Sequence, residues 1–98
     1  MSCILMSKQI HLIVQGKVQG VYFRAFTRRE AEKYGITGWV RNLANGDVEI
    51  KAQGGEAELE KMKQWCWKGS PHAKVNNVII QEDSASFDSS ISSFQIWH

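Results

Sequence analysis

The chain has 98 residues, of which 43% are hydrophobic, and its formal net charge at pH 7 is +2. A chain of this length has room for one compact core, so we expect a single domain spanning residues 1–98. Its 12 basic residues outnumber its 10 acidic residues only slightly and are interspersed with them, which gives no support to a nucleic-acid-binding function.

No sequence feature indicates export or membrane insertion. The N-terminal stretch MSCILMSKQIHLIV is interrupted by residues such as Lys8 and His11, and it lacks the basic and long apolar segments of a signal peptide. No apolar run approaches the length of a membrane span. Cys3 and Cys66 have no CxxC spacing, which favours free thiols in a reducing compartment over a disulfide. We therefore expect a cytoplasmic protein.

The first predicted elements are a strand and a helix. Apolar residues alternate over residues 10–14, which predicts a strand that ends near Gln15. After a turn that contains glycine, one apolar stripe predicts a helix, and Gly35 would end it in a left-handed conformation. The stripe consists of Phe23, Thr27, Ala31 and Tyr34.

A hairpin and a second helix follow. In the segment ITGWVRNLANGDVEIKAQGG, Asn45-Gly46 is a turn signal, and apolar residues alternate with polar ones after it. A second apolar stripe predicts a helix that begins among glutamates, as suits the helix dipole, and ends at Gly69 and Pro71. This stripe consists of Leu59, Met62 and Cys66.

The C-terminal part predicts two more strands. The first runs from about Val75 to Ile80, and its alternation slips between Val75 and Val78 as it does at a β-bulge. A polar loop over 82–93 then leads to a short strand that contains Phe94 and Ile96. The order βαββαβ with an added strand is that of the α+β ferredoxin-like fold, so we expect a sheet of four to five strands, antiparallel or mixed, with two helices packed on one face.

This topology brings together two segments that are distant in the sequence. In a split βαβ unit the strands on either side of a helix run parallel, with another strand between them. Their C-terminal ends therefore lie at the same edge of the sheet. We expect the loop after Gln15 to adjoin the end of the strand at Asn42.

The segment VQGKVQGVYFRAFTRR is a candidate anion site. Gly16 and Gly20 permit a loop whose N–H groups converge, and the free N–H groups of a helix start add to it. Arg24 falls in the first helical turn, where its guanidinium can hold two phosphate oxygens. Taken alone, the loop is equally compatible with a tight turn beside a solvated Arg24. Arg28 and Arg29 lie further along the helix, and their position is typical of a solvated face.

Asn42 is the second candidate residue. It shares strand parity with Gly38 and Val40, so its side chain is expected on the helix side of the sheet, beside the anion loop. Asparagine is also common at the start of hairpin loops, and residue type alone favours that interpretation.

Two long segments resemble the signature motifs of the acylphosphatase family. They are VQGKVQGVYFR (Val14–Arg24) and GWVRNLANGDVEIKAQG (Gly38–Gly54). The segment WCWKGSPHAKV (Trp65–Val75) is similar to the second helix of the family and the turn after it. The resemblance covers nearly the whole chain and implies the ferredoxin-like fold. It departs at Tyr34, where an aliphatic residue is usual, and in the tail 82–98, which is too variable to align.

The resemblance also implies an activity and a site. A member of this family hydrolyses small acyl phosphates to a carboxylate and inorganic phosphate, and a monomer is the default for so small a domain. Arg24 would bind the substrate phosphate and Asn42 would orient the attacking water. Backbone N–H groups would complete the phosphate-binding loop, and they belong to Gln19, Gly20, Val21, Tyr22 and Phe23.

Acyl phosphate chemistry is compatible with so few functional residues. The carboxylate that leaves has a conjugate acid with a pKa of roughly 4, so it needs no proton at neutral pH. Positioning and charge neutralisation supply most of the catalysis of phosphoryl transfer. His11, His72 and His98 lack the paired spacing of a metal site, and the cysteines add none. We therefore expect neither a metal ion nor a cofactor.

Two other functions compete with hydrolysis. One is a binding module that holds a phosphate or nucleotide in the same loop without turning it over. The other is an RNA-binding domain, which would show exposed aromatic residues on its central strands. The outward positions there are instead His11, Ile13, Asp47, Glu49 and Lys51. We therefore expect a small acyl phosphate as the partner, and neither nucleic acid nor a membrane.

Overall fold

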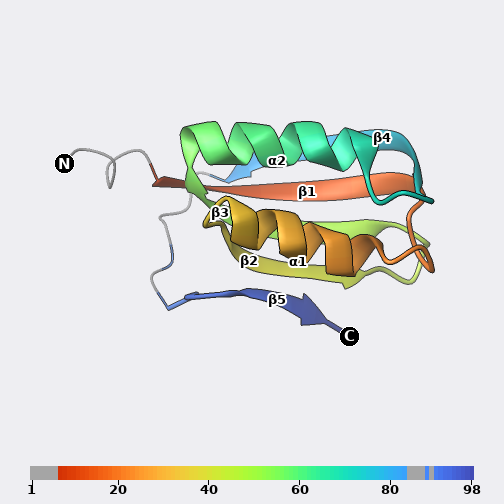
Figure 1. Cartoon of the computed structure of the whole chain (residues 1–98), viewed down its shortest axis with the longest axis horizontal. Coiled ribbons are helices and arrows are strands. Elements are labelled where there is room, and N and C mark those ends of the chain that lie inside the picture. Colours follow the sequence, from red (N-terminus) through yellow and green to blue (C-terminus); the bar gives the residue numbers. More distant parts are fainter. Residues whose placement is uncertain (1–6, 84–87, 89) are drawn as a thin grey trace.

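Five strands and two helices build the part of the fold that the structure describes. The computed structural model describes residues 7–83, 88 and 90–98. Along the chain the elements are β1 (Ser7–Lys17), α1 (Phe23–Lys33), β2 (Thr37–Asn42), β3 (Val48–Gly55), α2 (Glu56–Lys68), β4 (Lys74–Asp83) and β5 (Phe94–Trp97) (Figure 1). The predicted order of elements is therefore confirmed.

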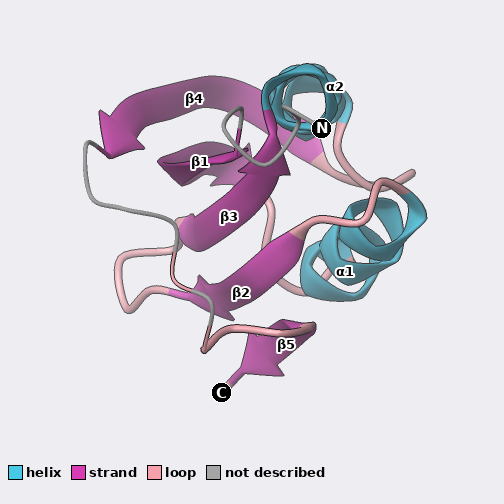
Figure 2. Ribbon diagram, turned by 90° about the vertical axis from the view of Figure 1, so that its left-hand side faces the viewer, coloured by secondary structure: helices cyan, strands magenta, loops and turns pink. Residues whose placement is uncertain are grey.

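The strands form one mixed sheet with both helices on the same face. Its order is β4-β1-β3-β2-β5. The pair β2–β5 is parallel, whereas β1 pairs antiparallel with β3 and β4, and β2 with β3. Figure 2 shows α1 and α2 side by side over one face of this sheet. The predicted ferredoxin-like α+β architecture is confirmed.

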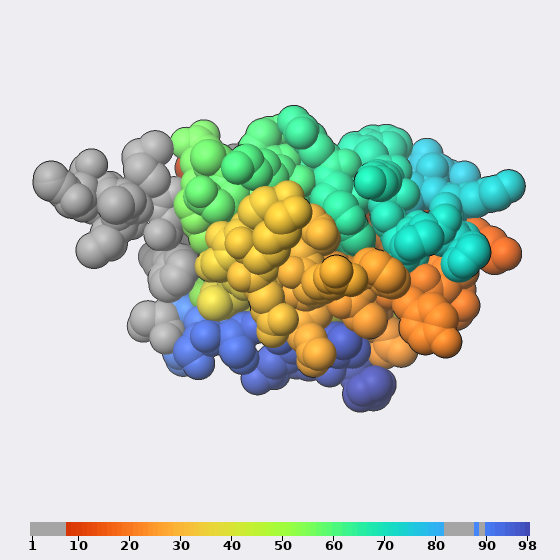
Figure 3. All heavy atoms as spheres, viewed as in Figure 1, coloured from red at the N-terminus to blue at the C-terminus, as the bar shows by residue number. Residues whose placement is uncertain are grey.

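The core lies between the sheet and the two helices, as the apolar stripes predicted. Alternate residues of β1 and β3 face each other across the ladder, for example Leu12 opposite Ile50, and both are fully buried. The space-filling view shows how the helices close over this layer, with the C-terminal segment along the edge beside α1 (Figure 3). Tyr34 is only partly buried at the margin of the core. The predicted helical residues that are buried are Phe23, Thr27, Ala31, Leu59, Met62 and Cys66.

The sequence predicted which strands form more accurately than where they end. β1 continues to Lys17 instead of ending near Gln15, because it pairs with β4 across a bulge: Gln15 lies opposite Asn77 and Gly16 opposite Val75. The predicted bulge in β4 is thus confirmed. β4 itself runs past the predicted 75–80, so the loop expected from residue 82 begins later. Residues 84–87 and 89 of that loop lie outside the described residues, as does Cys3.

Gly16 has a different role from the one that its place in the motif suggested. It lies inside β1 with φ 129°, and a Cβ atom there would be 2.1 Å from the carbonyl oxygen of Lys74. The residue must therefore be glycine because β4 approaches so closely. Of the two motif glycines, only Gly20 belongs to the loop between β1 and α1, where its φ of 75° is left-handed.

The predicted proximity of the loop and Asn42 is confirmed. β1 and β2 both pair antiparallel with β3, so they are parallel to each other and end at the same edge. Gln19 joins the two segments, because its Nε2 donates hydrogen bonds to the carbonyl oxygens of Leu43 and Asp47, both at 2.8 Å. The amide of Gln19 therefore fixes the anion loop against the β2–β3 hairpin.

The opposite face of the sheet carries a charge cluster next to Asn42. Glu49 accepts from Arg41, its partner on β2, and lies 2.7 Å from His11 Nε2 on β1. Burial raises the pKa of Glu49, but the hydrogen bonds and charges of His11 and Arg41 outweigh it, so this pKa lies below its ordinary value. The charged Glu49 thereby links β1 and β2, the strands on either side of β3.

Among the described residues, the aromatic side chains on the outer face of the sheet lie beside the edge strand β5. The outward positions of β1 and β3 carry no aromatic side chain, as expected, but Trp39 of β2 stacks on Trp97 of β5. Their ring centroids are 4.4 Å apart and the ring planes differ by 10°. This stack attaches the end of β5 to β2 and bears directly on the position of Arg24.

Candidate active site

The loop that enters α1 presents free backbone donors. Tyr22 has a left-handed backbone with φ 60°, and its carbonyl accepts the first helical hydrogen bond, from Phe26 N–H at 3.1 Å. The backbone N–H groups from Gln19 to Phe23 donate to no atom in the part of the chain that the structure describes. These N–H groups therefore remain available as donors to a bound molecule.

The start of α1 also lacks the usual compensating groups. No side chain caps it, and its first turn contains no acidic residue. In contrast, Glu56 and Glu58 lie in the first turn of α2. Negative groups normally stabilise a helix N-terminus, so the start of α1 keeps an uncompensated positive potential.

Arg24 lies in the first turn of α1 and is oriented by the C-terminal residues. Its Nη1 donates to the carbonyl oxygen of Trp97 at 3.1 Å and lies 3.4 Å from His98 Nδ1. No carboxylate of the described residues pairs with it. A guanidinium has five N–H donors, so most of them remain for a ligand.

Asn42 and Arg24 line the same pocket, which has a volume of about 400 Å³. Asn42 ends β2, and its Oδ1 is the buried side-chain acceptor without a hydrogen-bond partner among the described residues. Leaving such an acceptor unpaired costs about 1–3 kcal/mol, so this atom calls for a donor from a bound molecule or water. The other residues of the pocket are Val18, Gly20, Tyr22, Phe23, Ala25, Ile96 and His98.

The hairpin turn does not explain Asn42. The side chain that closes this turn is Asn45, whose Oδ1 accepts from the Asp47 N–H at 3.0 Å. Backbone bonds complete the turn, among them Leu43 N–H to Asp47 O at 2.8 Å. Asn42 therefore does not have the turn-forming role that residue type alone favoured.

Several pocket residues were missed at the sequence level. Ile96 and His98 come from β5 and the residue after it, in a tail that aligned with no motif. Val18 and Ala25 flank the loop, and Tyr22 contributes a side chain that is 77% exposed besides its predicted N–H group. Apolar alternation placed Ile96 in a strand, but no local signal indicated its neighbours.

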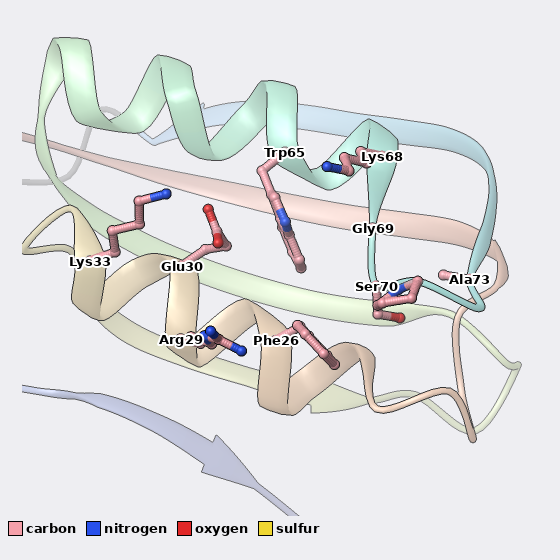
Figure 4. A pocket seen from close by; sticks show the side chains of 10 residues that line it. Phe26, Arg29, Glu30, Lys33, Trp65, Lys68, Gly69, Ser70 and Ala73 are labelled. Atoms are coloured by element: carbon pink, nitrogen blue, oxygen red, sulfur yellow. The ribbon is translucent and has the colours of Figure 1, made fainter.

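Other candidate groups lie apart from this pocket. Arg28 and Arg29 are exposed, as expected for a solvated face. Cys66 is a free, buried thiol, and burial raises its pKa to about 12, which makes it unreactive. Within residues 7–83, 88 and 90–98, no three His, Cys, Asp or Glu side chains gather as metal ligands would. A larger pocket between the helices contains none of the predicted site residues (Figure 4).

Comparison with known proteins agrees with the resemblance seen in the motifs. The sequence model of the acylphosphatase family matches residues 10–96. An acylphosphatase of Rubrobacter xylanophilus is 44% identical over 80 residues, which are 82% of this chain and 73% of that protein. Neither helix of the described residues combines the length and hydrophobicity that a membrane span requires.

Solved structures of the family superimpose closely on this one. An acylphosphatase from Coxiella burnetii has a TM-score of 0.88 at 38% identity, with 99% of each chain covered. The acylphosphatase from Bacillus subtilis has a TM-score of 0.87 at 38% identity, and the match covers 95% of this chain and 100% of that one.

Proposed function

The chain belongs to the acylphosphatase family, and from this premise we propose how its pocket works on a substrate. The protein is a hydrolase of acyl phosphates, which cleaves the carboxyl–phosphate bond and releases a carboxylate and inorganic phosphate.

The phosphoryl group binds where the loop and Arg24 converge. The free N–H groups from Gln19 to Phe23 and the uncompensated start of α1 attract its oxygens. Arg24 contributes the charge, and the carbonyl of Trp97 holds its guanidinium in place while leaving other N–H donors for phosphate. In phosphoryl transfer these donors stabilise charge on the equatorial oxygens of the transition state.

Asn42 holds the attacking water. Its unpaired Oδ1 accepts a hydrogen bond from the water, which directs a lone pair of the water oxygen toward phosphorus. The bond from phosphorus to the carboxyl oxygen breaks as the new P–O bond forms, the leaving oxygen departs as a carboxylate, and the protons of the water stay with the released phosphate. Because a carboxylate is stable at neutral pH, no acid has to protonate it.

The unpaired acceptor of Asn42 favours hydrolysis over simple phosphate binding. The buried, unpaired Oδ1 of Asn42 shares a pocket with Arg24 and Gly20, although Asn42 comes from a different element. A module that only held phosphate would gain nothing from an unpaired acceptor beside it, because phosphate oxygens are acceptors too. The arrangement is suited to a water that donates to Asn42 and attacks phosphorus.

The central test compares acetyl phosphate with p-nitrophenyl phosphate, a phosphate monoester, in the presence of EDTA. We expect acetyl phosphate to be hydrolysed at a rate that EDTA leaves unchanged. We expect no turnover of the monoester, because its leaving group is poorer than a carboxylate. Loss of activity in EDTA that a divalent ion restores would contradict the mechanism, and binding of phosphate without turnover would identify a binding module.

The Trp39–Trp97 stack is expected to position Arg24 for phosphate. For Trp39→Ala we expect the KM for acetyl phosphate and the Ki of inorganic phosphate to rise about three- to tenfold, as the loss of one aromatic stack predicts. Trp39→Phe should recover most of the loss, and Trp67→Ala, at an exposed residue of α2, serves as the control. A fall in kcat at unchanged Ki would show that the stack does not act through phosphate binding.

We also propose that the protein acts as a monomer in the cytoplasm, as one domain over residues 1–98. The match to the Coxiella burnetii protein over 99% of both chains supports a single domain. The free buried thiol of Cys66 is compatible with a reducing compartment.

A further inference from the structure

A second pocket lies between the two helices, away from the active site. α1 and α2 run antiparallel over the sheet, and a groove of about 750 Å³ opens between them at the end of α2 (Figures 1 and 4). This volume is in the range of small-molecule sites. The groove shares no lining residue with the pocket of Arg24 and Asn42.

Aromatic side chains from both helices face this groove. Trp65 projects from α2 toward α1, and Phe26 lies across from it (Figure 4). Phe23 supports Trp65 from the core, with ring centroids 5.4 Å apart and planes tilted by 47°. Phe23 is itself fully buried, so the indole is held in place as a fixed flat surface. Such surfaces bind planar rings by stacking.

The charges around the groove are mostly positive and are not paired. Arg29, Lys33 and Lys68 line it together with one carboxylate, Glu30. None of these four forms an ion pair with another described residue. The helix dipoles account for Lys33 and Lys68, which lie in the last turns of their helices, but Arg29 is in the middle of α1. The Arg29 guanidinium lies 6.0 Å from the ring centroid of Phe26, and the Lys33 ammonium lies 5.4 Å from that of Tyr34.

We propose that this groove binds a planar aromatic ring that carries a phosphate, as in a nucleoside monophosphate. The ring stacks on Trp65, and the cations hold the dianionic phosphate, whose charge matches the excess of three cations over one carboxylate. Both parts of the ligand are needed, because a stacked ring alone leaves the cations unpaired and a phosphate alone leaves the indole exposed.

The probe for this site is adenosine 5′-monophosphate, added to the full chain. Amide chemical shifts in ¹⁵N-labelled protein report where it binds. We expect saturable shifts at Phe26, Arg29 and Trp65. Adenosine, which lacks the phosphate, and ribose 5-phosphate, which lacks the ring, should each bind at least about tenfold more weakly, since each loses one of the two contacts.

Matched variants test whether the groove cations bind the phosphate. In Arg29→Ala/Lys68→Ala we expect the Kd for adenosine monophosphate to rise at least about tenfold, because two charged contacts are lost. Arg28→Ala, on the neighbouring exposed residue outside the groove, should leave it unchanged. Hydrolysis of acetyl phosphate should be the same in all of them, which checks the fold.

Three results overturn this proposal: absence of saturable shifts, an equal Kd in the double variant and in Arg28→Ala, or shifts confined to residues 19–24. The last would place the nucleotide in the active site. The proposed function does not depend on the outcome, because the acetyl phosphate assay tests it separately.

Discussion

Arg24→Ala is expected to lose both phosphate binding and turnover. Removing the arginine should lower kcat/KM for acetyl phosphate by roughly 10³-fold or more, as for other arginines that stabilise a transferring phosphoryl group. Inhibition by inorganic phosphate should vanish at the concentrations that inhibit the parent protein. Steady-state kinetics with a phosphate titration measures both effects.

The physical reason lies in the site around Arg24. The loop N–H groups carry only partial charges, so in the proposed mechanism the guanidinium supplies the full positive charge for the phosphoryl oxygens. Arg28→Ala is the matched control, because this arginine is on the same helix but exposed and outside the pocket. Near-normal kinetics in Arg24→Ala would remove Arg24 from the site. Unchanged thermal unfolding would show that the loss does not come from the fold.

For Asn42→Ala we expect turnover to fall while phosphate still binds. The loss of one positioned water should lower kcat by about 10²-fold, whereas the Ki of inorganic phosphate should stay within about twofold of the parent. Arg24 and the loop remain intact in this variant, which is why phosphate binding persists. A parallel disappearance of phosphate inhibition and activity would mean that Asn42 binds the phosphate itself.

Stability provides a second readout for Asn42. Its Oδ1 is buried and unpaired, so this side chain lowers the stability of the folded protein. We expect the midpoint of thermal unfolding of Asn42→Ala not to fall below that of the parent protein. Asn76→Ala, at an exposed residue of β4, is the control for the substitution itself. A large loss of stability in Asn42→Ala would instead assign Asn42 a structural role.

Local pattern alone predicted which elements form and which faces they bury. Alternation marked β1 and β3, and the stripe through Phe23, Thr27 and Ala31 marked the buried face of α1. These patterns are readable because a side chain's face depends only on its position within a short segment. The slip between Val75 and Val78 even located the bulge. The motif resemblance then singled out Arg24 and Asn42.

Topology, once predicted, also placed the two candidate segments together. The split βαβ order requires β1 and β2 to end at the same edge, and the Gln19 contacts to Leu43 and Asp47 confirm it. No property of Asn42 itself indicated a site, since residue type favoured a turn. Only the structure shows that Asn45 closes the turn, and that the Oδ1 of Asn42 is buried without a partner among the described residues.

The tertiary structure alone decided where strands end and what surrounds Arg24. β1 reaches Lys17 because β4 pairs with it there, which also explains why Gly16 is a glycine. The contacts of Arg24 with Trp97 and His98 depend on the parallel pairing of β5 with β2, across more than half of the chain. Pairing between distant strands leaves no periodic signal in either segment. The sequence therefore determined the elements and the two candidate residues, and packing determined the pocket that both of them line.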